Sequence, residues 1–172
     1  AVAALAQYIF TPIPVPQWGE KEIAASRVVH ARPQDLPARP MHTADPLNLF
    51  TVVEIGDHHV TILDGDRFEP LWRFPSRFAL HGGAKYSPDG RFVYLASRDG
   101  WVSKYDLHGL MPVAETRVAV NTRNIAVSSD GRTIAAGNGL PPSIVILDAG
   151  DLSVKKIIPV TGDGGKPSRV SA

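Results

Sequence analysis

Three alternating strands recur along the chain at a constant spacing, and this spacing restricts the possible folds. Val60–Asp64, Val102–Asp106 and Ile144–Asp148 each end on an aspartate, and successive aspartates lie 42 residues apart. A second marker, Ser-x-Asp-Gly-Arg, occupies residues 87–91 and 128–132, with a period of 41. A four-stranded propeller blade takes about 40 to 45 residues, whereas common helical repeats are shorter. The two markers therefore predict an all-β fold of propeller blades rather than a β-sandwich with a chance repeat.

The number of repeats is too small for a closed ring. The chain holds two full repeats, an incomplete first one and the start of a fourth at residues 167–172. Propellers close at about four to eight blades, because each blade buries its faces only against its neighbours. We therefore interpret residues 41–172 as the first blades of a longer propeller and expect the chain to be a fragment. The fragment alone is expected to be inactive.

Composition excludes several classes of function. A formal net charge of +1 gives no field strong enough to indicate nucleic-acid binding. No apolar run approaches the roughly 20 residues that a membrane-spanning helix needs. The absence of cysteine excludes disulfides, zinc–cysteine sites and the Cys-x-x-Cys-His attachment of c-type haem within these 172 residues. The opening residues lack the basic region of an intact signal peptide.

The first forty residues differ from the rest. Ala1–Tyr8 is rich in good helix formers and predicts the last turns of a helix. Alternate prolines at 12–16 impose an extended path, and residues 22–29 fit either a further helical turn or an edge strand. We expect residues 1–40 to be the end of a preceding helical domain with a proline-rich linker. An ordinary N-terminal arm fits the same residues.

The repeat also predicts which residues share one end of the blades. With the strands of a blade labelled A to D from the centre outward, the D–A loops and the B–C turns lie at the same, upper end. His81 falls in the first D–A loop, Arg123 in the second and Arg98 in a B–C turn. Arg169, at the start of the fourth repeat, corresponds to Arg123. His58 and His59 lie in the B–C turn of the preceding blade.

These residue types suit a planar, anionic ligand that carries a metal. His81 is followed by Gly82 and Gly83, which allow a large group to approach the backbone. A neutral imidazole is a common ligand for iron, although a lone loop histidine more often bonds a nearby carbonyl. Arginines such as Arg98 and Arg123 bind carboxylates at two points, although each also fits an ordinary loop charge.

Residues 47–158 resemble the haem d1 propeller family. The resemblance is carried by Leu-Phe-Thr-Val at 49–52, Leu-Asp-Gly-Asp at 63–66, His-Gly-Gly-Ala-Lys at 81–85, Gly-Arg-Phe-Val-Tyr at 90–94, Ser-Arg-Asp-Gly-Trp at 97–101 and the proline pair at 141–142. It implies an eight-bladed ring in which His81 is the proximal iron ligand of haem d1. It further implies that Arg98, Arg123 and Arg169 hold the carboxylates of the tetrapyrrole, beside Gly82, Gly83 and Lys85.

Within the family, the chain is most similar to the biosynthetic branch that has a cytochrome c domain in front. Nitrite reductases lack the paired glycines and carry an arginine where this chain has Lys85. The resemblance implies a periplasmic oxidoreductase that converts a propionate of dihydro-haem d1 to the acrylate of haem d1. It also implies a c-type haem in the preceding domain, and contacts with other haem d1 biosynthesis proteins and the nitrite reductase. No residue is assigned as the catalytic base, because His58 and His59 lie one blade from His81.

Two alternatives remain at this stage. The first is the haem d1 domain of a cytochrome nitrite reductase, in which the haem is a permanent prosthetic group. The second is a haem-free interaction propeller of the WD40 type. Against the latter, the chain has Leu-Asp, Tyr-Asp and Leu-Asp at the ends of the three repeated strands, where WD40 proteins have Trp-Asp.

Overall fold

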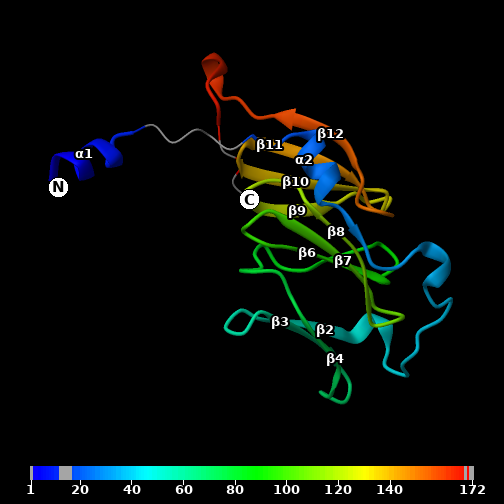
Figure 1. The fold of residues 1–172 in the computed structure, drawn as a ribbon. Helices are drawn as coiled ribbons and strands as arrows, with labels where there is room; N and C mark the ends of the chain where they lie inside the picture. The colour runs from blue at the N-terminus through cyan, green and yellow to red at the C-terminus, as the bar shows by residue number, and fades with distance from the viewer. Residues whose placement is uncertain (1, 12–16, 169, 171–172) are drawn as a thin grey trace.

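The twelve described strands form three antiparallel sheets that stack side by side, and eleven of them make up the blades (Figure 1). The computed structural model describes residues 2–11, 17–168 and 170. The first sheet contains β2 (Leu49–Glu54), β3 (His59–Asp64) and β4 (Pro70–Pro75). The second contains β5 (Lys85–Tyr86), β6 (Phe92–Ala96), β7 (Trp101–Asp106) and β8 (Met111–Arg117). The third contains β9 (Asn121–Val127), β10 (Thr133–Leu140), β11 (Pro142–Asp148) and β12 (Val154–Pro159).

Each sheet is an up-and-down meander, so the expected blade order is confirmed. Neighbouring strands along the chain pair with each other, and the second and third blades have all four strands A to D. Among the described residues, the first blade has the three strands that correspond to B, C and D. The fold is therefore a set of β-propeller blades, as the repeat predicts.

The aspartate that ends each third strand has the same structural role in all three blades. Asp64, Asp106 and Asp148 each accept a hydrogen bond from the backbone N–H two residues further on, over 2.9, 3.3 and 2.7 Å. Such bonds stabilise a tight turn, because the side chain replaces a backbone acceptor. The 42-residue period thus marks the turn between the third and fourth strands of every blade.

Apolar side chains fill the space between adjacent blades. Val60 and Ile62 of β3 are fully buried against the second blade, and Ile134 and Leu147 are fully buried between the second and third. Trp72 packs across the first interface, with its ring centroid 5.9 Å from that of Tyr105. This tryptophan therefore lies between the first and second blades.

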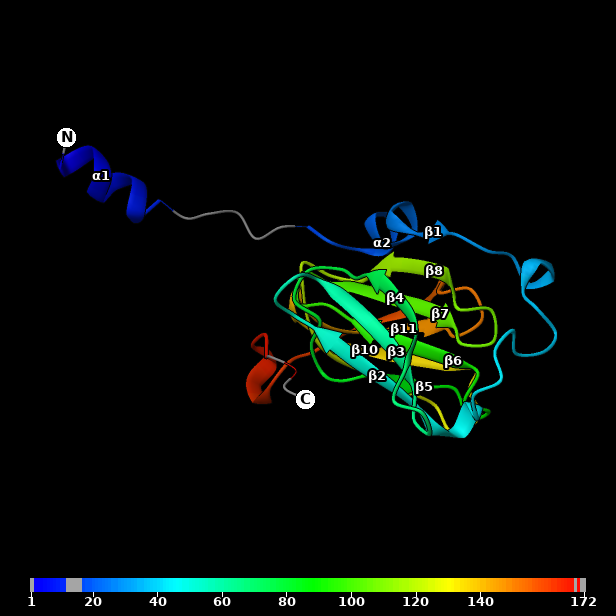
Figure 2. The same ribbon diagram turned by 90° about the horizontal axis from the view of Figure 1, so that it is seen from below.

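The N-terminal segment reaches the outer edge of the blades. Residues 22–29 were expected to form a helical turn or an edge strand, and they contribute to both α2 (Glu20–Ser26) and β1 (Val28–Val29). Strand β1 pairs with β8, and α2 buries Ile23 against the second and third blades (Figure 2). As expected, a helix, α1 (Val2–Ile9), is present, and none of its residues is buried.

Three short 3₁₀ turns complete the described structure. The proline run at 12–16, predicted to be extended, lies outside the described residues. None of the helices in the described ranges is long and apolar enough to cross a membrane. The three 3₁₀ turns are Pro33–Asp35, Pro46–Asn48 and Asp163–Gly165.

Candidate functional site

The loop between β4 and β5, the β6–β7 turn and the start of β9 meet at the upper end of the blades. Leu80 forms a β-bridge with Ser97. The backbone N–H of Arg98 donates to the carbonyl of Ala79 over 3.0 Å, and the carbonyl of Arg98 accepts from Thr122 over 3.2 Å. Backbone hydrogen bonds therefore join the first D–A loop, the B–C turn and the start of β9. Arg123 was predicted in the second D–A loop, but β9 already begins at Asn121, so Arg123 is the third residue of this inner strand.

His81 is held by two hydrogen bonds. Its backbone N–H donates to the carbonyl of Ala96 over 2.8 Å, and its Nδ1 lies 2.7 Å from the carbonyl oxygen of Arg123. A carbonyl oxygen only accepts, so Nδ1 carries the proton. Nε2 of the neutral ring then keeps its lone pair, which is the form that binds a metal. The structure thus fixes the tautomer that an axial iron ligand requires.

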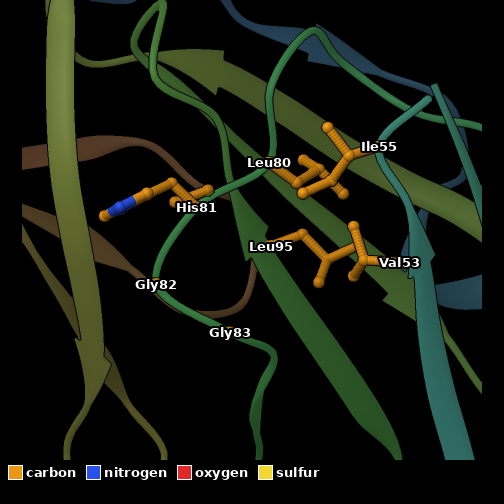
Figure 3. Close-up of a pocket in the computed structure, with 8 residues that line it drawn as sticks. Val53, Ile55, Leu80, His81, Gly82, Gly83 and Leu95 are labelled. Carbon is orange, nitrogen blue, oxygen red and sulfur yellow. The ribbon is translucent and has the colours of Figure 1, made fainter.

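The His81 side chain and the cavity beside its backbone lie on opposite sides of the loop. Figure 3 shows the imidazole pointing away from four apolar side chains that face one another. These side chains line a cavity of about 230 Å³ together with the backbone of residues 81–83. The cavity therefore backs the histidine loop. Its apolar lining comprises Val53, Ile55, Leu80 and Leu95.

The two glycines after His81 are required for different reasons. Gly82 has φ 86°, and a Cβ there would lie 2.2 Å from Oδ1 of Asn124, so packing excludes any side chain. Gly83 has φ 70°, and a Cβ there would meet nothing closer than Nζ of Lys85 at 3.9 Å. The backbone of Gly83 therefore borders open space, whereas Gly82 is enclosed. Nζ of Lys85 donates to the carbonyl of Gly82 over 2.7 Å and so holds this loop in place.

The start of the same loop is anchored by a partly buried ion pair. The guanidinium of Arg77 donates twice to the carboxylate of Glu115, over 3.1 and 2.8 Å, and lies 3.8 Å from the centroid of a Trp101 ring. Burial alone raises the pKa of Glu115, but hydrogen bonds from Arg77, Ser103 and His30 outweigh it and hold the pKa below its ordinary value. The Arg77–Glu115 pair therefore attaches the start of the loop to strand β8.

Among the described residues, the side chain of Arg98 makes no hydrogen bond that stabilises the β6–β7 turn, unlike those of its neighbours Ser97 and Asp99. In Ser-Arg-Asp-Gly-Trp, Ser97 donates to Asp99 over 2.6 Å and accepts from the backbone N–H of Trp101 over 3.1 Å. Gly100 has φ 99°, and a Cβ there would lie 1.8 Å from the carbonyl oxygen of Ala119. The Arg98 side chain is exposed, and no hydrogen bond or ion pair joins it to another described residue.

Arg123 is also without a carboxylate partner among the described residues, although most arginines of the chain are paired. It lies at the start of β9 beside a cavity of about 250 Å³ that Asn124 and Val170 also line. The predicted residue Arg169 lies outside the described residues, so its side chain is not placed. The ion-paired arginines are Arg27, Arg32, Arg67, Arg73, Arg77, Arg91 and Arg132.

The site suits a ligand that brings its own metal. No group of three His, Cys, Asp or Glu side chains converges to hold a free ion in the part of the chain that the structure describes. A haem requires as little as one axial bond from the protein, because the macrocycle supplies the other ligands. His81 with its available Nε2 fits that requirement, and the unpaired Arg98 and Arg123 fit carboxylate side chains.

Sequence reasoning did not identify two polar features at this end. Asn124 packs against Gly82, and a buried chain of hydrogen bonds joins Thr122, Asn138 and Ser143 over 2.7 and 3.1 Å. The sequence did indicate these features, because β9 is an inner strand that begins with polar residues where apolar ones are expected. His58 lies in the β2–β3 turn, and His59 is the first residue of β3. The ring centroid of His58 is 5.2 Å from that of Phe78 in the histidine loop.

The chain belongs to the cytochrome D1 heme domain family, whose model matches residues 44–172. A dihydro-heme d1 dehydrogenase from Pseudomonas aeruginosa is 60% identical over 100% of this chain, which corresponds to 35% of that protein. A solved structure titled "Dihydro-heme d1 dehydrogenase NirN in complex with DHE" superimposes with a TM-score of 0.92 and 60% identity, covering 99% of this chain and 37% of that one.

Two other relatives are less similar. The protein NirF of Stutzerimonas stutzeri is 36% identical over 72% of this chain and 32% of its own length. A nitrite reductase from the same organism is 26% identical over 92% of this chain and 29% of its own length. The chain thus spans about a third of the length of the relatives that it matches, and it is more similar to the dehydrogenase than to these two proteins.

Proposed function

We propose that this chain is part of a haem d1 biosynthesis enzyme that oxidises dihydro-haem d1 to haem d1. Residues 41–172 contribute the first blades of its eight-bladed propeller, and residues 1–40 connect these blades to a domain with a c-type haem. The 60% identity to a dihydro-heme d1 dehydrogenase along the whole chain supports this proposal over nitrite reduction. A periplasmic location and contacts with other haem d1 biosynthesis proteins and the nitrite reductase belong to the same proposal.

The observation that carries the proposal is the hydrogen bond between Nδ1 of His81 and the carbonyl of Arg123, at 2.7 Å. It leaves Nε2 of His81 free to bind the iron of the tetrapyrrole substrate. The carbonyl that orients the His81 imidazole belongs to Arg123, one of the arginines proposed to bind a carboxylate. The proposed iron ligand and this arginine are therefore directly connected by a hydrogen bond. Axial ligation therefore determines the position of the substrate relative to Arg123.

The arginines determine which side chain of the substrate reacts. Arg98 and Arg123 come from two different blades and have no carboxylate partner among the described residues. We assign them to the carboxylates of dihydro-haem d1, with Arg169 as a third candidate. Charge-assisted, two-point bonds fix the rotation of the macrocycle about the axial bond. Lys85 acts through the carbonyl of Gly82 and positions the loop.

The reaction removes two hydrogens from a propionate side chain. The CH₂–CH₂ bond becomes the CH=CH bond of an acrylate, one proton goes to a base and one to solvent, and two electrons go to one-electron acceptors. The c-type haem proposed for the preceding domain would be one such acceptor. The base lies outside the residues assigned here.

The test uses the full-length protein without oxygen. Dihydro-haem d1 is added with an oxidised electron acceptor, and the tetrapyrrole is extracted and identified by absorbance and mass. The expected product is lighter by two hydrogens. A protein that leaves dihydro-haem d1 unchanged, yet reduces nitrite when given an electron donor, would support the nitrite reductase alternative.

A further inference from the structure

A separate cavity lies between the second and third blades, beneath the N-terminal segment. It has a volume of about 570 Å³ and shares no lining residue with the cavity behind His81. A volume of this size is typical of sites for small molecules, which are also mostly apolar. Seven apolar residues contribute to its wall, and Arg27, Asp148 and Asp151 also line it. The apolar residues are Val29, Ala31, Pro33, Leu36, Phe92, Val113 and Ala114.

A buried lysine also lines this cavity. Lys104 of β7 is 4% exposed, and its Nζ donates to the carbonyls of Ala149 and Gly150 over 2.9 and 2.8 Å. The ammonium lies 3.9 Å from the centroid of the Phe92 ring. An ammonium has three N–H donors. Two of them are used by carbonyls, so one remains for a further acceptor.

The acidic groups near Lys104 are already paired with other cations. Asp106, Asp148 and Asp151 are the carboxylates whose charges act on it, and each forms its own ion pair at 2.7 to 3.3 Å. Arg32, at the edge of the cavity, is likewise paired with Asp35 at 2.9 Å. Lys104 is therefore a buried cation with no carboxylate partner among the described residues, a costly arrangement. The three pairs are Arg91–Asp106, Lys155–Asp148 and Arg27–Asp151.

We propose that this cavity binds a small apolar monocarboxylate, with its carboxylate on the ammonium of Lys104 and its hydrocarbon part along the apolar wall. The carboxylate supplies the counter-charge that Lys104 lacks, and the hydrocarbon covers apolar surface. A neutral analogue gains only the second of these effects. A cationic analogue of the same length is repelled. The site is distinct from the proposed haem site and does not depend on it.

The test compares three probes of equal chain length, namely octanoate, octan-1-ol and octylammonium, by calorimetry on the full-length protein at pH 7. We expect octanoate to bind most tightly and octylammonium most weakly. Lys104→Met should weaken octanoate binding about tenfold, the effect of losing one charge-assisted hydrogen bond, and leave octan-1-ol binding unchanged. His81→Ala should retain full octanoate binding, which separates this site from the proposed haem site.

Two further measurements distinguish binding from a structural role. Burial lowers the pKa of Lys104 to about 8, so octanoate affinity should fall as pH rises from 7 to 9.5, while octan-1-ol affinity stays constant. Val29, 47% exposed at the cavity wall, can be replaced by tryptophan without disturbing Lys104. Val29→Trp should fold normally and lose octanoate binding. Octanoate that binds no tighter than octan-1-ol, or that binds Val29→Trp with full affinity, would overturn the proposal.

Discussion

At the lower ends of the blades arginines are paired with carboxylates, whereas at the upper ends Arg98 and Arg123 have no such partner among the described residues. Arg91 donates to the fully buried Asp106 over 2.8 Å, and Arg132 donates to Asp130 over 2.7 Å. Both pairs lie beside the Asp-Gly turns that join strands A and B, at residues 89–90 and 130–131. The lower end thus uses these charges to stabilise turns. At the upper end Arg73 and Arg77 are paired with carboxylates as well, whereas Arg98 and Arg123 are left available for a ligand.

The glycines with positive φ also have different roles at the two ends of the blades. At the lower end Gly90 and Gly131 have φ values of 73° and 69°, and they occupy tight turns that the repeat predicts. At the upper end Gly82 and Gly83 also have positive φ, but they follow a histidine that hydrogen bonds orient. The comparison indicates that the upper loops are held rigid by backbone bonds, which leaves the His81 and Arg98 side chains for binding.

The largest expected effect on stability is at the lower end. Arg91→Ala leaves Asp106 as a buried, unpaired charge, and breaking such a pair costs about 3–5 kcal/mol. We expect a large drop in the free energy of unfolding, measured with urea on the full-length protein. Arg132→Ala is the matched control, because its pair with Asp130 is exposed and screened by solvent, so its loss should change the free energy of unfolding little. Equal losses for the two variants would contradict the assignment of stability to the buried pair.

The second largest effect is expected at Gly82, and it should be larger than the effect at Gly83. Gly82→Ala places a Cβ 2.2 Å from Asn124 in a left-handed conformation, at a combined cost of about 2–5 kcal/mol. Gly83→Ala pays only the conformational cost of about 1–2 kcal/mol. We expect Gly82→Ala to displace His81 and weaken tetrapyrrole binding more than Gly83→Ala does, by absorbance titration. The reverse order would show that Gly83, not Gly82, determines the loop conformation.

A smaller effect depends on pH. Burial lowers the pKa of Lys104 from 10.5 to about 8, so between these pH values the unfolded state binds more protons than the folded state. The free energy of unfolding should therefore rise with pH across this window, relative to that of Lys104→Met. Urea titrations of both proteins at several pH values measure the difference. A difference that does not change with pH would exclude a depressed pKa for this lysine.

The smallest expected change in stability is at Arg98. Its side chain is exposed, so Arg98→Ala should change the free energy of unfolding by no more than about 0.5 kcal/mol. Arg132→Ala should likewise change it little. Only Arg98→Ala should lower the affinity for dihydro-haem d1, by about tenfold, with the iron spectrum intact. Equal affinities of the two variants would remove Arg98 from the proposed site.

The repeat made much of the fold predictable. The aspartates that end β3, β7 and β11 and the Asp-Gly turns are local features, so their spacing alone places strands and turns. The same spacing places His81, Arg98 and Arg123 at one end of the blades. The roles assigned to these three residues rest on the family resemblance and remain proposals.

The remaining details depend on contacts between residues distant in sequence. No local pattern indicates that Nδ1 of His81 would meet the carbonyl of a residue 42 positions away, or that Asn124 would enclose Gly82. The pairing of β1 with β8 likewise joins distant residues, because Val29 lies opposite Ala114 in the sheet. The buried Lys104 was also missed, because a lysine inside an alternating strand usually faces solvent.

The most direct test of the central claim is the visible spectrum of dihydro-haem d1 bound to His81→Ala in the full-length protein. Nε2 of His81 is the axial ligand that we assign, whereas Arg98 and Arg123 still attract the carboxylates. We therefore expect the spectrum to change strongly while affinity falls only in part. His108→Ala, which removes a histidine from the β7–β8 turn at the lower end, should leave both unchanged. An unchanged spectrum for His81→Ala would contradict the assignment of this residue as the iron ligand.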